Sequence, residues 1–111
     1  MKMHAAGIPI AAGTDSANWP LFLNYFHGAS MVLELEYLQN AGMAPLDIVS
    51  VATRIPAEMM RVADRFGTVE EGKMADLIIC KNDPLTDMRH LRNLMWVMKG
   101  GEMKTPAEWM N

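Results

Sequence analysis

The stretch "GIPIAAGTDS", residues 7–16, contains a short apolar run that ends in a carboxylate. The run Ile8–Ala12 lacks polar alternation, which is typical of a strand buried on both faces of a parallel α/β sheet. Asp15 follows at the carboxyl end of this run, where enzymes built on parallel sheets assemble their sites, so Asp15 is a candidate functional residue. Asp and Ser after a strand also cap the next helix or close a turn, and the stretch alone leaves both interpretations open.

The composition is that of a globular chain of one ordinary domain. Half of the 111 residues are hydrophobic, and the 10 basic and 13 acidic residues give a net charge of −3. The charges are scattered, so we expect neither a nucleic-acid nor a membrane partner. The single cysteine, Cys80, excludes an internal disulfide and favours a reducing cytoplasm. No apolar run reaches the length of a signal peptide or of a membrane span.

Helical periodicity dominates the first part of the chain. Apolar residues at helical spacing predict a helix from Ala29 to Asn40, with a stop at Gly42. Pro45 suits the first turn of a second helix, which Pro56 is expected to interrupt. A third helix is expected over Ala57–Asp64.

The pattern changes to strands and turns after Gly67. Ala75–Cys80 reads as a buried strand, and Leu94–Met98 alternates well enough for another. Lys99–Glu102 is typical of a hairpin turn that returns the chain through the following residues. The boundary near Gly67 therefore separates an α/β part from a small β part.

The histidines are weaker candidates than Asp15. His27 lies in the loop after Asp15, and the adjacent Gly28 permits close approach of the backbone. A loop histidine is more often a surface or hydrogen-bonding residue than a ligand. His4 and His90 lie in polar surroundings, so we expect both to be solvated.

Other polar residues give little support for a site. Glu34 and Glu36 are two positions apart and do not face one another on a helix. Cys80 reads as a small buried hydrophobic residue. The sequence contains no His-x-His, no Cys-x-x-Cys and no glycine-rich phosphate loop. Taken from its residues alone, the chain is an α/β segment with one suggestive aspartate.

Four segments of the sequence, taken together and in their order along the chain, resemble a known protein family, although each segment alone is a weak match. They are "GIPIAAGTDS" at 7–16, "HGASMVLELEYLQNAGMAPLDIVSVAT" at 27–53, "PAEMMRVADRFGTVEEGKMADLIICKNDPLTDM" at 56–88 and "VMKGGE" at 97–102. Together they resemble the C-terminal end of a metal-dependent amidohydrolase. The similarity is greatest to the imidazolonepropionase and prolidase-like branch of that superfamily.

The resemblance implies a fold and a site. Residues 1–66 would supply the eighth strand and following helices of a (β/α)8 barrel, and residues 67–111 part of a small composite β-sandwich lobe. Asp15 would be a ligand of the catalytic metal, usually zinc, and its proton shuttle, and His27 a substrate-binding residue of the pocket. A divalent metal would activate water, which attacks an amide, cyclic amide or dipeptide-like small molecule and cleaves a carbon–nitrogen bond.

The chain lacks the other residues that such a site needs. The family's His-x-His, its bridging lysine or glutamate and its two later histidines belong to regions that are not represented here. We therefore expect the isolated chain to be inactive and to bind no stoichiometric metal. One alternative is a non-catalytic remnant that acts as a self-associating structural or interaction module, and another is a subunit that complements a chain carrying the missing ligands.

Overall fold

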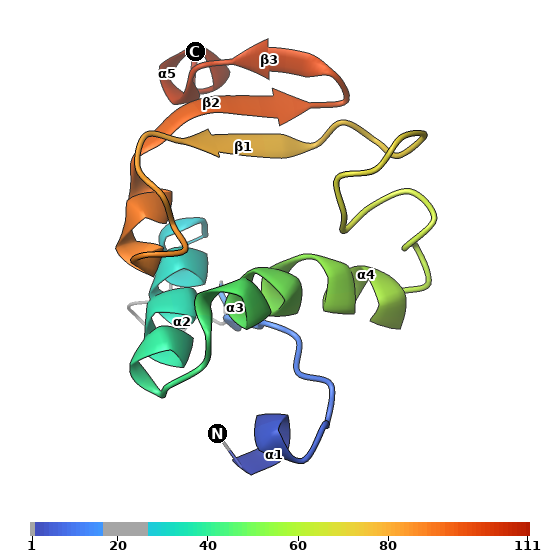
Figure 1. Ribbon diagram of the computed structural model, residues 1–111. Coiled ribbons are helices and arrows are strands. Elements are labelled where there is room, and N and C mark those ends of the chain that lie inside the picture. The colour runs from blue at the N-terminus through green and yellow to red at the C-terminus, as the bar shows by residue number, and fades with distance from the viewer. Residues whose placement is uncertain (1, 17–26) are drawn as a thin grey trace.

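The computed structural model describes residues 2–16 and 27–111 as a small α/β structure with a helical layer and a three-stranded sheet (Figure 1). Its elements in chain order are α1 (Lys2–Ala5), α2 (Ala29–Asn40), α3 (Pro45–Ala52), α4 (Arg54–Met59), β1 (Leu77–Cys80), the 3-10 helix η1 (Met88–Arg92), β2 (Leu94–Lys99), β3 (Glu102–Lys104) and α5 (Pro106–Trp109). None of the helices over these residues has the length and apolarity needed to cross a membrane.

Helix α2 has the bounds that its periodicity predicts. Leu35 is buried on its inner face, and Gly42 ends the helix in a left-handed conformation with φ of 89°. The Met43 N–H donates to the Leu38 carbonyl at 3.1 Å, which closes the last turn and directs Met43 into the core. The glycine stop is therefore confirmed.

The expected boundary at Pro56 is wrong. Helix α3 ends at Ala52, and α4 begins at Arg54 with Pro56 as its third residue. Proline is tolerated there because the first-turn N–H groups have no partner within the helix. Helix α4 ends at Met59 rather than continuing toward Asp64, because the Val62 N–H donates back to the Ala57 carbonyl at 2.9 Å and closes the helix end.

The sheet confirms the predicted hairpin. Strands β1, β2 and β3 pair antiparallel in that order, and Met98 of β2 faces Met103 of β3. The turn between them contains Gly100 and Gly101, both with positive φ. Asp76, just before β1, accepts the Gly100 N–H at 2.7 Å and so ties this turn to the entrance of β1.

The end of the chain packs on the sheet. Thr105 and Glu108 form a reciprocal cap at the start of α5. The indole N–H of Trp109 donates to the Val97 carbonyl at 3.0 Å, and the Lys104 ammonium lies 4.6 Å from the indole ring centroid. These contacts hold α5 against β2 and β3.

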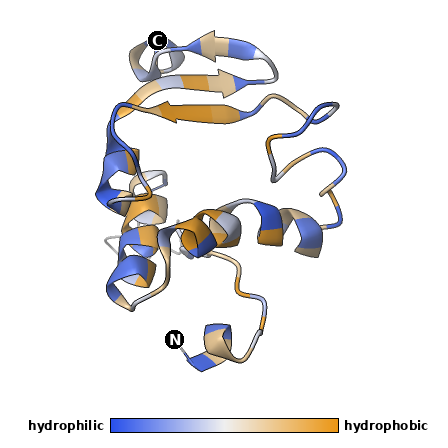
Figure 2. Cartoon of the chain, viewed as in Figure 1, coloured by the Kyte–Doolittle hydropathy of each residue, from blue (hydrophilic) through white to orange (hydrophobic). Residues whose placement is uncertain are grey.

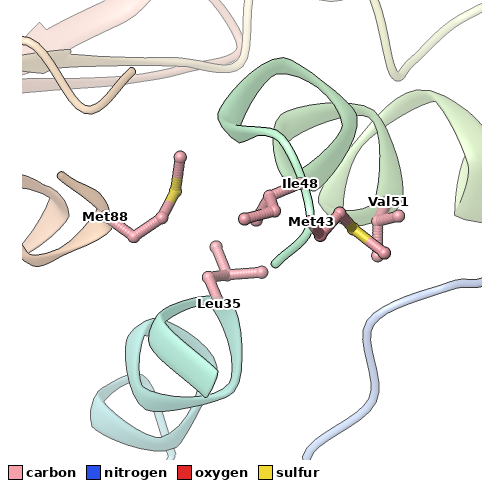
Figure 3. Close-up of a cluster of buried hydrophobic side chains, with 5 residues drawn as sticks. All are labelled: Leu35, Met43, Ile48, Val51 and Met88. Carbon is pink, nitrogen blue, oxygen red and sulfur yellow. The ribbon is translucent and has the colours of Figure 1, made fainter. Parts of the chain in front are cut away.

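The core lies where α2, α3 and η1 meet. Five buried apolar side chains converge there from these helices and the α2–α3 loop: Leu35, Met43, Ile48, Val51 and Met88 (Figure 3). Full burial of one such side chain contributes about 1.5–3 kcal/mol. The cluster therefore stabilises the helical layer and its attachment to η1.

The expected strand Ile8–Ala12 is not a strand in this structure. The segment has no regular secondary structure, and one backbone bond holds its end, from the Ala12 N–H to the Val51 carbonyl at 3.0 Å. Ile10 and Ala12 pack against the core, whereas Ile8 is 51% exposed. A doubly buried strand needs neighbours on both edges, and the described residues supply none for this segment.

Candidate functional site

Asp15 lies in a turn that is anchored to the helical layer. The Ala12–Val51 bond and the packing of Ile10 and Ala12 fix the chain up to Ala12. Asp15 then adopts a left-handed conformation with φ of 49°, which is uncommon outside glycine but tolerated by aspartate. Its side chain is exposed at the end of the anchored segment.

The hydrogen bonds of this turn belong to Thr14 rather than to Asp15. The Ser16 N–H donates to Thr14 Oγ1 at 3.3 Å, and the two hydroxyl groups lie 2.7 Å apart. Over the residues that the structure describes, the Asp15 carboxylate accepts no hydrogen bond. Helix α2 begins at an N-cap, Gly28, without a side-chain cap, so Asp15 does not cap that helix.

His27 is exposed in the turn that precedes α2. Its carbonyl accepts the Ala29 N–H at 3.1 Å, a contact that closes the turn. No contact between the imidazole and Asp15 is recorded, and the chain between Ser16 and His27 lies outside the described residues.

Within residues 2–16 and 27–111, no three His, Cys, Asp or Glu side chains are grouped closely enough to hold a metal ion. Asp15 therefore offers one oxygen ligand position, and the described part of the chain does not complete it. Catalytic zinc usually has three protein ligands.

Two histidines expected to be solvated have partners. His4 Nε2 lies 3.2 Å from Asp47 Oδ2, which connects α1 with α3. The His90 ring lies 2.8 Å from the Asp83 carbonyl through Nδ1 and is half-buried. Cys80 is half-buried rather than buried, and desolvation raises the pKa of its thiol. The contacts of the two histidines stabilise the fold.

Contacts between distant residues join α2 to η1. Arg92 pairs with Glu36, with an Nη2–Oε1 distance of 2.6 Å, and Gln39 Oε1 accepts the Met88 N–H at 3.0 Å. A polar cavity of about 490 Å³ lies beside them. At its edge Asp87 binds the guanidinium and N–H of Arg89, which lowers the pKa of its carboxyl to about 2. Sequence reasoning missed these contacts, because no local pattern relates residues about 50 positions apart.

A second cavity, of about 540 Å³, lies between the helical layer and β1 and is largely apolar. Its wall includes Val49 and Thr53 from the helical side, Phe66, and Leu77 and Ile78 from the sheet side. Ile78 is 52% exposed, and β1 is hydrophobic along its whole length (Figure 2).

Residues 1–104 match the family model of the amidohydrolase family. The chain belongs to the amidohydrolase family. Amidohydrolases are generally metal-dependent hydrolases. No curated protein sequence matches the chain. The resemblance stated from the sequence is thus confirmed at the level of the family.

Solved amidohydrolase structures superpose on most of the chain. A Xaa-Pro dipeptidase with bound methionine in the active site is 31% identical, with a TM-score of 0.80 over 94% of this chain and 24% of its own. Molinate hydrolase is 26% identical, with a TM-score of 0.82 over 93% and 25%. The A. niger ochratoxinase is 30% identical, with a TM-score of 0.75 over 95% and 24%. The chain therefore spans about a quarter of the length of these relatives.

Proposed function

We propose that this chain supplies Asp15 as a metal ligand and proton shuttle to an amidohydrolase that cleaves carbon–nitrogen bonds, with the remaining ligands outside the described residues. The observation that carries the proposal is the exposed Asp15 carboxylate, which ends an anchored segment and whose turn is closed by other groups. Membership of a metal-dependent family supports it.

The chemistry assigned to Asp15 is that of a carboxylate beside an activated water. Asp15 would hold one position of a divalent ion, here proposed to be zinc, and such an ion would supply an activated water by lowering the pKa of that water to near neutrality. Asp15 would accept a proton from that water during attack on the carbonyl carbon and would return it to the departing nitrogen. We propose His27 as a substrate-binding residue at the mouth of the same pocket.

The fold proposal follows from the anchored segment. Residues 1–66 correspond to the last strand and following helices of a (β/α)8 barrel, with Ile8–Ala12 becoming a strand when its neighbours are present. Residues 67–111 correspond to part of a small β-sandwich lobe. The helices that precede residue 67 and the sheet that follows it support this division.

The substrate class is proposed from the relatives. A Xaa-Pro dipeptidase and two other hydrolases share the fold of this chain at 26–31% identity. We infer a small amide or dipeptide-like substrate from what these relatives hydrolyse. The inference concerns the whole enzyme, since the relatives are about four times longer than the part that matches. The missing three quarters would lie in the same polypeptide or in a complementing subunit.

The 111-residue chain by itself is expected to bind less than one zinc ion per molecule and to hydrolyse no Xaa-Pro dipeptide or N-acyl amino acid. One carboxylate cannot replace the roughly three protein ligands of a catalytic zinc site. Metal analysis after dialysis and a ninhydrin assay for released amine test this directly. Stoichiometric zinc together with turnover would show that the site is complete without further residues.

The free edge of β1 favours a second candidate function, a self-associating module. Among the described residues, β1 pairs with β2 only, and it carries no charge. Ile78 and Ile79 are 52% and 43% exposed, and the apolar cavity adjoins this strand. Strand β3, at the other edge, carries Glu102 and Lys104, which discourage pairing with another strand. Self-association is therefore proposed to bury β1.

Ile78→Lys is expected to convert self-associated chain to monomer, because a lysine on β1 places charge at the surface that association buries. Met103→Lys on β3 is the matched control, since Met103 is 47% exposed, and it should leave the association unchanged. Sedimentation velocity at micromolar concentrations distinguishes the species. A strictly monomeric wild-type chain, or equal effects of the two lysines, would argue against association through β1.

A further inference from the structure

We propose that Thr14 is a positioning residue that holds the carboxylate of Asp15 in its working geometry; this inference rests on the function proposed above. Thr14 Oγ1 accepts the Ser16 N–H at 3.3 Å and lies 2.7 Å from the Ser16 hydroxyl. The two contacts bridge Asp15 from one side to the other. They stabilise the backbone where its φ, at 49°, is unfavourable for a residue with a side chain.

The same contacts occupy both polar groups of Ser16. The Ser16 N–H and hydroxyl are the nearest polar groups that follow Asp15 in sequence, and Thr14 engages both. Without the Thr14 hydroxyl, the Ser16 N–H loses its acceptor and the Ser16 hydroxyl loses its hydrogen-bond partner, so nothing bridges Asp15. The backbone of Asp15 would then lose the contacts that hold its left-handed conformation.

Thr14 suits this position because both its side-chain direction and the backbone that precedes it are restricted. Its branched Cβ restricts χ1, so Oγ1 has few alternative directions. The backbone just before it is held by the Ala12–Val51 bond, and Thr14 is half-buried. The turn is thereby attached to α3. This attachment matters because a shift of about 1 Å in a reacting group can cost about 10²-fold in rate.

The first test uses the 111-residue chain and needs no activity. Thr14→Val keeps the shape of the side chain and removes the hydroxyl, whereas Thr14→Ser keeps the hydroxyl. In NMR spectra, the one-bond Cα–Hα coupling and the Cα shift of Asp15 report the left-handed conformation. We expect Thr14→Val to lose this signature and Thr14→Ser to retain it. Thr105→Val, which removes the cap hydroxyl of α5, controls for the loss of a threonine hydroxyl elsewhere.

The second test uses the active polypeptide that contains this sequence together with the remaining ligands. Thr14→Val should lower kcat by about 10²-fold with little change in KM. Thr14→Ser should recover most of the lost kcat. Circular dichroism checks that the variants are folded.

The outcomes separate this inference from the proposed function. If Asp15→Asn abolishes turnover while Thr14→Val preserves kcat and the Asp15 signature, Thr14 has no positioning role. If Asp15→Asn itself leaves turnover intact, the proposed function fails. A Thr14→Ser variant as impaired as Thr14→Val would assign the effect to packing and overturn the role of the hydroxyl.

Discussion

Asp15→Asn is expected to lower kcat by about 10³-fold or more in the proposed whole amidohydrolase, because the proton shuttle proposed for Asp15 would contribute about 10²–10⁴-fold. Asparagine has nearly the same shape and also tolerates the left-handed conformation, so the turn between Thr14 and Ser16 should persist. The substitution therefore removes the negative charge and the proton acceptor without removing the side chain. Steady-state kinetics and the zinc content of the purified variant measure the two consequences separately.

Asp64→Asn is the matched control for this substitution. Asp64 is also an exposed aspartate that lies outside the helices and strands, in the segment after α4. It should leave kcat unchanged, since nothing in the proposed chemistry involves it. An Asp15→Asn enzyme that retained a tenth or more of the wild-type kcat would exclude Asp15 as the proton shuttle.

Gly67→Ala is expected to produce the largest loss of stability of any Gly→Ala substitution in the chain. A Cβ at Gly67 would lie 2.7 Å from the Ala57 Cβ and 3.1 Å from both the Arg54 Cα and the Thr53 carbonyl oxygen. These neighbours are backbone atoms or a methyl group fixed to α4, so they cannot rotate away. With φ of +96°, the residue also lies where side chains are strained. Together, overpacking and strain should lower the free energy of unfolding by about 3 kcal/mol or more.

Gly72→Ala separates the two causes of this loss. Gly72 has a similar φ, +85°, but no atom lies within 4 Å of its added Cβ. It should cost only the backbone strain, about 1–2 kcal/mol. Urea unfolding followed by circular dichroism gives both values. Equal losses for the two variants would mean that α4 accommodates the added methyl group without overpacking.

The elements that the sequence predicted well are those with strong local signals. Helix α2 combines apolar spacing with a glycine stop, and the β2–β3 turn has two consecutive glycines. The error at Pro56 has a local cause as well, because the residue that breaks a helix interior is harmless in a first turn. Recognising α4 required knowledge of where the preceding helix ended, at Ala52.

The Ile8–Ala12 run could not be assigned correctly from its own residues. Its composition predicts a strand, but a strand exists only where partner backbones satisfy its N–H and C=O groups. The apolar pattern identified Asp15 as a candidate site residue. No pattern in the chain predicted the other metal ligands that such a site needs. The pairing of Glu36 with Arg92 had no sequence signal, since it depends on how α2 and η1 pack.

The bond between Ala12 and Val51 has a consequence for protein engineering. It attaches the segment that carries Asp15 to a helical layer formed by later residues. If the polypeptide is cut before this segment, the segment and the helical layer remain in the same fragment. A two-fragment reporter enzyme designed on this architecture would keep Asp15 in a fixed position within one fragment. Recovery of hydrolysis would then report the meeting of two fragments rather than the refolding of a detached loop.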